Sequence, residues 1–207
     1  MRLFAGLELP GDVKDELAGL IERLRPSAPD AKWVPRDNLH LTLSFLGEVS
    51  EDRLAPISGA LREAASSVAG PIATRLDGSG AFPTHRRARV VWVGLDDPAG
   101  RIARAAAAVA GALEPLGFPK EKRAWTAHLT IARLRTPADV TEVLRTQVPE
   151  RRFEVAGVTL FRSRLARPSP TYEALERFDL GPDGPSIRSL RSLRSPRQRG
   201  SSRPSGT

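Results

Sequence analysis

The sequence predicts an α+β fold built from two similar lobes. A chain of 207 residues, 40% hydrophobic and 27% charged, is long enough for one domain with a well-buried core. Strand-like and helix-like patterns follow one another in the order β-α-β-α-β-β-α-β-α-β-β. The same His-Leu-Thr-aliphatic frame begins two of the strands, at His40 and at His128, and each half of the chain supplies one of them.

The first third of the chain predicts two strands and two helices. Residues 2–9 alternate apolar side chains and stop at Pro10, which predicts a strand. An amphipathic helix follows from Gly11, and residues 26–35 read as a loop that holds Trp33. The His40 strand is expected to end near Gly47. Residues 50–52 then cap a second helix that runs to about residue 68, before Gly-Pro breaks it.

The rest of the chain predicts five strands and two helices. Residues 72–76 and 89–95 are expected to form strands joined by a long basic loop, and an Ala-rich helix starts at Pro98 and ends before Gly117. The His128 strand is followed by a short helix from Pro137 to about residue 146. Residues 153–164 and 172–180 predict the last two strands. We expect residues 1–180 to form the domain.

The C-terminal segment, residues 181–207, differs in composition from the rest. It holds six arginines and one aspartate among serines, prolines and glycines, and it contains almost no apolar surface to bury. We therefore predict a disordered tail. The tail carries most of the formal net charge of +8, so the remainder is only mildly basic. Such a charge is compatible with a polyanionic substrate without requiring one.

Composition also limits the classes of function. The chain has no cysteine, which excludes disulfides, cysteine metal sites and thiol catalysis. Glu8 interrupts the apolar start too early for a signal peptide, and the run 103–113 is too short to span a bilayer. We expect a cytoplasmic, monomeric protein without a cofactor or a membrane partner.

The two histidine strands predict the site. Side chains alternate between the two faces of a strand, so His40, Thr42 and Ser44 would share one face while Leu39, Leu41, Leu43 and Phe45 fill the core. His128 and Thr130 would repeat this arrangement. Two imidazoles facing one pocket form a general acid–base pair near neutral pH, because histidine titrates near 6.5. The hydroxyls of Thr42 and Thr130 would hold the non-bridging oxygens of a phosphodiester.

These motifs resemble the paired His-x-Thr-x motifs of the two-histidine phosphoesterases. Within that superfamily the chain is similar to the RNA 2′,3′-cyclic phosphodiesterases, also called 2′-5′ RNA ligases. The likeness covers about residues 1–180 and includes several shorter segments in the expected order: Arg2-Leu3-Phe4, Trp33-Val34-Pro35, Asn38-Leu39-His40, Phe45-Leu46-Gly47, Phe82-Pro83, Gly117-Phe118 and Phe161-Arg162-Ser163. The resemblance implies antiparallel sheet in each lobe, helices packed outside and a central cleft.

The resemblance also implies the reaction. A terminal 2′,3′-cyclic phosphate of RNA, or a small cyclic nucleotide, would be hydrolysed to a 2′-phosphomonoester without a metal. His40 would be the proton donor to the departing 3′ oxygen, His128 the proton acceptor that activates water, and Arg133 a phosphate contact. The residues alone do not assign the acid and the base. Arg133 lies at an odd-numbered position, whereas His128 and Thr130 lie at even ones, so regular alternation would place its side chain on the opposite face of the strand. It reaches the phosphate only if a bulge or a strand end redirects it.

Several alternatives stay open at this stage. The histidines could be satisfied core residues, although two copies of one frame favour catalysis. A zinc site would need a third ligand, and neither motif has a His-x-x-x-His pattern or an acidic cluster beside it. The same cleft could belong to a non-catalytic RNA- or nucleotide-binding module. RNA 2′-5′ ligation would be the reverse chemistry and is expected only as a side reaction.

Overall fold

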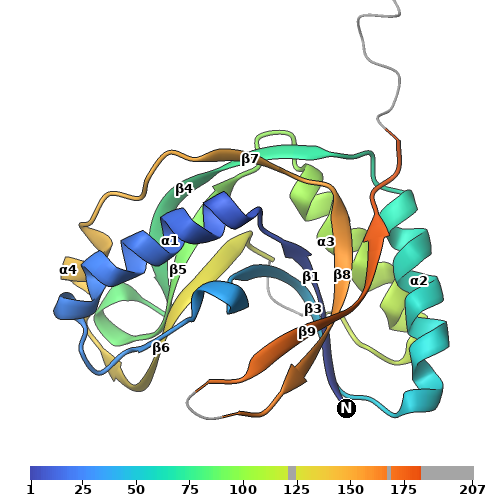
Figure 1. The fold of residues 1–207 in the computed structure, drawn as a ribbon, viewed down its shortest axis with the longest axis horizontal. Helices are drawn as coiled ribbons and strands as arrows, with labels where there is room; N and C mark the ends of the chain where they lie inside the picture. The colour runs from blue at the N-terminus through green and yellow to red at the C-terminus, as the bar shows by residue number, and fades with distance from the viewer. Residues whose placement is uncertain (121–124, 167–168, 183–207) are drawn as a thin grey trace, which may run out of the picture.

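The computed structural model describes residues 1–120, 125–166 and 169–182. This part of the chain forms one curled sheet of nine strands in the order β7-β4-β5-β6-β3-β1-β8-β9, with β2 paired to β6 (Figure 1). The strands are β1 (Arg2–Glu8), β2 (Lys32–Trp33), β3 (His40–Glu48), β4 (Ile72–Phe82), β5 (Ala88–Asp96), β6 (His128–Ala138), β7 (Arg152–Val155), β8 (Gly157–Arg164) and β9 (Thr171–Asp179). The helices are α1 (Gly11–Leu24), α2 (Leu54–Ser66), α3 (Arg101–Leu113) and α4 (Thr141–Leu144).

The sheet divides into two four-stranded lobes, β7-β4-β5-β6 and β3-β1-β8-β9. They meet where β3 lies beside β6, and the register there is the single antiparallel pair Leu41–Leu129. Every pairing between the named strands is antiparallel. The predicted α+β class with two similar lobes is therefore confirmed, and the two histidine strands form its seam.

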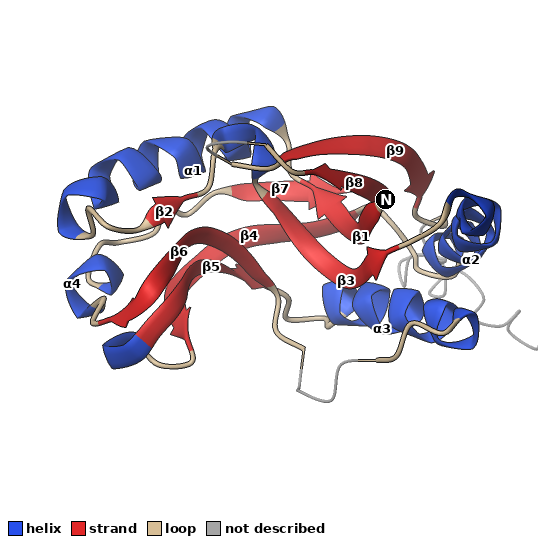
Figure 2. Ribbon diagram, turned by 90° about the horizontal axis from the view of Figure 1, so that it is seen from below, coloured by secondary structure: helices blue, strands red, loops and turns tan. Residues whose placement is uncertain are grey.

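Each lobe draws its strands from both halves of the chain. The β8–β9 hairpin joins the free edge of β1, and the β4–β5 hairpin joins β6. Helix α1 follows β1 but lies over the β4 and β6 side of the sheet, as both views show (Figures 1 and 2). Helices α2 and α3 pack together against the other lobe. Strand pairing over long distances therefore interleaves the two halves of the chain.

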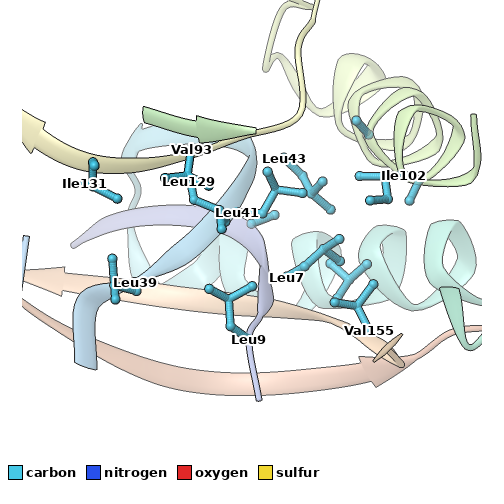
Figure 3. Close-up of a cluster of buried hydrophobic side chains, with 14 of the residues drawn as sticks. Leu7, Leu9, Leu39, Leu41, Leu43, Val93, Ile102, Leu129, Ile131 and Val155 are labelled. Carbon is cyan, nitrogen blue, oxygen red and sulfur yellow. The ribbon is translucent and has the colours of Figure 1, made fainter. Parts of the chain in front are cut away.

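One hydrophobic core supports both lobes. Helix α1 buries its predicted apolar stripe of Val13, Leu17, Leu20, Ile21 and Leu24. Leu41 and Leu129 are each no more than 1% exposed, so the seam between the lobes is anchored in this core. Figure 3 shows Leu41 and Leu129 close together, with Leu7 and Leu43 on the side of the helices. One face of the seam is thus buried in the core, and the opposite face carries the polar side chains.

Some predicted boundaries were wrong. The predicted loop 77–88 is mostly strand, because β4 continues to Phe82 across a register shift after Leu76. Gly78 sits in this shift with a φ of 65°, a conformation that glycine adopts without steric cost. Strand β6 extends to Ala138, where a helix was predicted to begin. The predicted strand 153–164 is divided into the two strands β7 and β8, and the short strand β2 lies in the predicted loop 26–35.

Gly181, the first residue of the predicted tail, is hydrogen-bonded to the segment that follows α2. The N–H of Gly181 donates to the carbonyl of Val68 at 2.8 Å, and its carbonyl accepts from the N–H of Gly70 at 2.8 Å. A side chain at this position would lie 2.2 Å from the carbonyl oxygen of Ser66, so the close approach requires glycine. The predicted tail from residue 183 onward lies outside the described residues. In the described part, no helix is long and apolar enough to cross a membrane.

Candidate active site

The two predicted histidines lie on the two strands that join the lobes. His40 is the first residue of β3 and His128 the first of β6. Because Leu41 pairs with Leu129 in an antiparallel register, the seam places His40 opposite Thr130 and Thr42 opposite His128. The four side chains predicted for the site are therefore related by a local twofold axis through the leucine pair. They share the face of the seam that is not buried in the core.

Backbone carbonyls fix both imidazole rings in the same way. Nδ1 of His40 lies 2.7 Å from the carbonyl oxygen of Asn38, and Nδ1 of His128 lies 2.9 Å from that of Thr126. A carbonyl oxygen only accepts, so Nδ1 carries the proton and donates in each case. The neutral rings therefore hold a lone pair on Nε2. Nε2 is therefore the nitrogen at which each neutral ring can take up a proton.

The two histidines have different surroundings. The His40 ring lies 4.7 Å from the ring of Phe4 and meets Tyr172 edge-on at 5.2 Å between ring centroids. The His128 ring meets Phe82 edge-on at 5.2 Å and lies 6.3 Å from Trp92. Burial against the aromatic cluster lowers the pKa of His40 to about 4. The positive charges of Lys14, Arg133 and His128 lower it further, against the bond to Asn38, so His40 is neutral in the free protein at pH 7.

This shift predicts a pH-dependent stability. The unfolded chain binds a proton on His40 near pH 6.5, whereas the folded protein binds it only near pH 4. Stability from this group is thus complete above pH 6.5 and is lost as the pH falls toward 4. Between pH 7 and pH 5 the loss should be about 2 kcal/mol. Urea denaturation of wild type and His40→Asn at both pH values measures it, and an equal pH effect in the two proteins would contradict the assignment.

The two threonines also differ. The Thr42 hydroxyl lies 2.9 Å from Nε2 of His40, so it donates to the neutral ring. In the part of the chain that the structure describes, no such bond joins Thr130 to His128. Gly6 lies opposite Thr42 on β1, and a Cβ there would be 2.7 Å from the carbonyl oxygen of Leu41 and 3.5 Å from the His40 ring. The glycine therefore allows β1 to approach the backbone of Leu41, next to His40.

A bulge in β6 brings the side chain of Arg133 to the same face as His128 and Thr130. Along β6 the pairing with β5 runs Thr130–Trp92 and then Ala132–Val91, so Ile131 is an extra residue. An extra residue reverses the alternation beyond it. Arg133 consequently pairs with Val90, on the same face of β5 as Trp92, and its side chain is exposed on the site face. The structure therefore brings Arg133 together with His128 and Thr130 as the prediction required.

The same bulge occurs in β3, and it overturns the prediction for Phe45. Thr42 pairs with Gly6 and Ser44 with Ala5, so Leu43 is the extra residue. Phe45 then pairs with Phe4, and its side chain is 61% exposed where the alternating pattern predicted a core residue. Ser44 leaves the face of His40 for the same reason. The sequence carries a signal for this shift, because position 46 is an apolar leucine although regular alternation would place it on the polar face. In the structure Leu46 is buried.

Two further residues at the site were missed by the sequence analysis. Lys14, on α1, lies close enough for its charge to lower the pKa of His40. Tyr172, at the start of β9, packs its ring against both His40 and Phe4. Both belong to elements that meet β3 only through the tertiary fold. Within the described ranges, no group of three or more histidine, aspartate or glutamate side chains is arranged to hold a metal ion.

Comparison with known proteins agrees with this geometry. A family model described as the 2′-5′ RNA ligase superfamily matches residues 13–167, a range that contains both histidine motifs. The chain belongs to this superfamily. A relative from Archaeoglobus fulgidus, named RNA 2′,3′-cyclic phosphodiesterase, is 34% identical over 86% of this chain and 100% of its own length. One of the same name from Thermus thermophilus is 35% identical over 87% of this chain and 90% of its own.

Solved structures of the superfamily share the fold. A crystal structure of a Thermus thermophilus protein superposes with a TM-score of 0.74 at 30% identity, covering 89% of this chain and 100% of the other. Escherichia coli LigT complexed with 3′-AMP superposes with a TM-score of 0.68 at 28% identity, over 86% and 97% of the two chains. The fold of this chain is thus shared with these solved structures.

Proposed function

We propose that this chain is an RNA 2′,3′-cyclic phosphodiesterase that hydrolyses a terminal 2′,3′-cyclic phosphate to a 2′-phosphomonoester. The observation that carries the proposal is the pair of imidazoles on either side of the Leu41–Leu129 pair, each with Nδ1 bound to a backbone carbonyl. This leaves Nε2 as the ring nitrogen that exchanges a proton, and Nε2 of His40 is bonded to the Thr42 hydroxyl in the free protein. The names of the relatives supply the substrate. A small cyclic nucleotide would react in the same way.

In the proposed reaction the histidines move the protons. Nε2 of His128 accepts a proton from water, whose oxygen attacks phosphorus. The bond from phosphorus to the 3′ oxygen breaks, and His40 donates a proton to that oxygen. Thr42, Thr130 and Arg133 hold the phosphate oxygens, where negative charge increases in the transition state. No metal or cofactor takes part in these steps.

The neutral state of His40 in the free protein adds a condition to this scheme. A donor must be protonated, and the pKa of His40 is lowered to about 4 by burial and neighbouring positive charge. An anionic phosphate beside Arg133 and Lys14 offsets that charge and favours the imidazolium. The proposal therefore implies that substrate binding is coupled to proton uptake at His40.

Product analysis tests the proposal. Adenosine 2′,3′-cyclic phosphate incubated with the protein in EDTA should yield adenosine 2′-phosphate. A 3′-phosphate product would reverse the roles of His40 and His128. No hydrolysis, or hydrolysis only after metal is added, would overturn the proposal, and binding without product would favour an RNA-binding module. Ligation should stay a side reaction, because water at about 55 M outcompetes a 5′-hydroxyl that is not bound in place.

The proposal also includes the oligomeric state, the domain bounds and the location of the protein. We propose that the active unit is a monomer. We further propose that residues 1–180 are the catalytic domain, that residues 181–207 are an appended basic tail, and that the protein acts on RNA in the cytoplasm. Sedimentation of the active protein tests whether it is a monomer.

A further inference from the structure

Lys32 and Arg133 form a pair of like charges across two neighbouring strands. Lys32 on β2 lies directly opposite Arg133 on β6, and Trp33 lies opposite Ala132 in the same register (Figure 2). Trp33 and Ala132 are buried in the core, at 7% and 0% exposed, so Lys32 and Arg133 point to the opposite face, which is that of the active site. The short strand β2 therefore places a second cation next to the proposed phosphate contact.

No carboxylate neutralises this pair of cations. In the described part of the chain, neither Lys32 nor Arg133 takes part in an ion pair, and both residues are exposed. Like charges directly opposite each other on antiparallel strands are destabilising. The neighbouring cation Arg36 is instead held by Asp15 at 2.5 Å and by Asp37 at 2.9 Å. The folded protein therefore contains a repulsion between Lys32 and Arg133 that a bound anion would relieve.

Arg135 extends the positive surface along β6. Leu134 packs against the core, whereas Arg133 and Arg135 on either side of it are exposed, so these two side chains share a face. Arg89 of β5 reaches the same stretch and donates to the carbonyl of Arg135 at 3.1 Å. Among the residues that the structure describes, no acid forms an ion pair with Arg89 or Arg135 either. The positive surface of Lys32, Arg133 and Arg135 therefore begins at the active site and follows β6 away from it.

The arginines on the outer strands of the other lobe are paired with acids. Arg162 and Arg164 on β8 both bond to Glu173 on β9, at 2.6 and 2.8 Å. Arg177 on β9 lies 4.0 Å from Glu8. A lack of counter-ions, as found around Lys32, is thus not a general feature of the cations of this sheet. Positive charge without a counter-ion beside a cleft attracts a polyanion.

The chemistry of the substrate identifies the anion that fits this surface. The terminal nucleotide carries the cyclic phosphate on its 2′ and 3′ oxygens, so its linkage to the rest of the RNA is at the 5′ oxygen. We propose that Lys32 binds this 5′ phosphodiester, so that the RNA chain leaves the active site along β2 and β6. The inference rests on the proposed function and deepens it, because it identifies the surface that distinguishes an RNA end from a mononucleotide. Arg135 then meets the next phosphate, and such backbone contacts carry no sequence preference.

Two substrates that differ by one phosphodiester test the assignment: adenosine 2′,3′-cyclic phosphate and the dinucleotide adenylyl-adenosine 2′,3′-cyclic phosphate. Lys32→Gln should raise KM for the dinucleotide about 3- to 10-fold, as expected for one charge-assisted contact at an exposed site. Its kcat, and its kinetics on the mononucleotide, should stay within about twofold of wild type. The slope of log kcat/KM against log salt for the dinucleotide should become less steep by about 0.7, the loss of one phosphate contact on a single strand.

A dinucleotide with a neutral methylphosphonate linkage shows whether the charge of the phosphodiester is what Lys32 binds. Wild type and Lys32→Gln should hydrolyse it equally well, and Lys32→Arg should behave as wild type on all three substrates. Arg164→Gln is the matched control, because Arg164 is an exposed arginine of the sheet that Glu173 already holds, and it should change none of the kinetics.

Three results would overturn the inference. Equal losses in Lys32→Gln on the mononucleotide and the dinucleotide would place Lys32 on the cyclic phosphate. Unchanged kinetics on both would mean that Lys32 is only a solvated surface residue. A loss that persists with the methylphosphonate linkage would show that charge is not what is recognised. If wild type hydrolyses neither natural substrate, the proposed function itself fails.

Discussion

His40→Ala and His128→Ala should each lower kcat by at least about 10²–10⁴, the usual contribution of a positioned general acid or base. The reason is that each ring presents Nε2 while a backbone carbonyl holds Nδ1. Acid and base act as a unit, so the double variant should lose little more than the worse single one. Wild type should show a bell-shaped dependence of kcat/KM on pH, and each single variant should lose one limb.

Matched variants separate chemistry from folding. An asparagine at either position retains an N–H that reaches the carbonyl of Asn38 or Thr126 but has no Nε2, so His→Asn should be as inactive as His→Ala and better folded. His85, the third histidine, lies on an exposed short turn between β4 and β5, and His85→Ala should behave as wild type. Full activity in His40→Asn or His128→Asn would rule out the two-histidine mechanism.

The motif that predicts the site is local, so the sequence alone indicates which of its side chains share a face. A strand with His at one position and Thr two positions later presents both on one face, whatever the strand pairs with. The apolar positions between them, such as Leu41 and Leu129, then face the core, as the structure confirms. The doubled frame therefore identified two strands that belong side by side, although nothing local shows that they share a seam.

The parts that the sequence could not predict depend on pairing. Leu43 and Ile131 are extra residues only in the pairing with the neighbouring strands β1 and β5, which the sequence does not reveal. Regular alternation along β3 therefore wrongly predicted that Phe45 lies in the core. Interleaving of the two chain halves has the same origin, since β8 joins β1 across most of the sequence. The low pKa of His40 arises from Phe4, Tyr172 and Lys14, which reach it from three separate elements.

Thr42→Val and Thr130→Val should each lower kcat about 10²–10³-fold, or about 2–4 kcal/mol, as expected for the loss of a donor to a developing anion. Valine keeps the β-branched shape that suits a strand and removes only the hydroxyl. The two variants should differ in pH dependence. Thr42 bonds to Nε2 of His40 at 2.9 Å, so Thr42→Val should also shift the limb that belongs to His40, whereas Thr130→Val should change the rate alone.

Two control variants determine whether the hydroxyls act as proposed. Thr→Ser at either position keeps the hydroxyl and should retain most of the activity. Ser44→Ala should be close to wild type, because the bulge at Leu43 pairs Ser44 with Ala5 and turns it from the face of Thr42. Regular alternation would instead predict that Ser44 shares the phosphate with Thr42. If both Thr→Val variants stay within about threefold of wild type, the hydroxyls are only strand residues, and a large loss in Ser44→Ala would mean that β3 continues without the bulge.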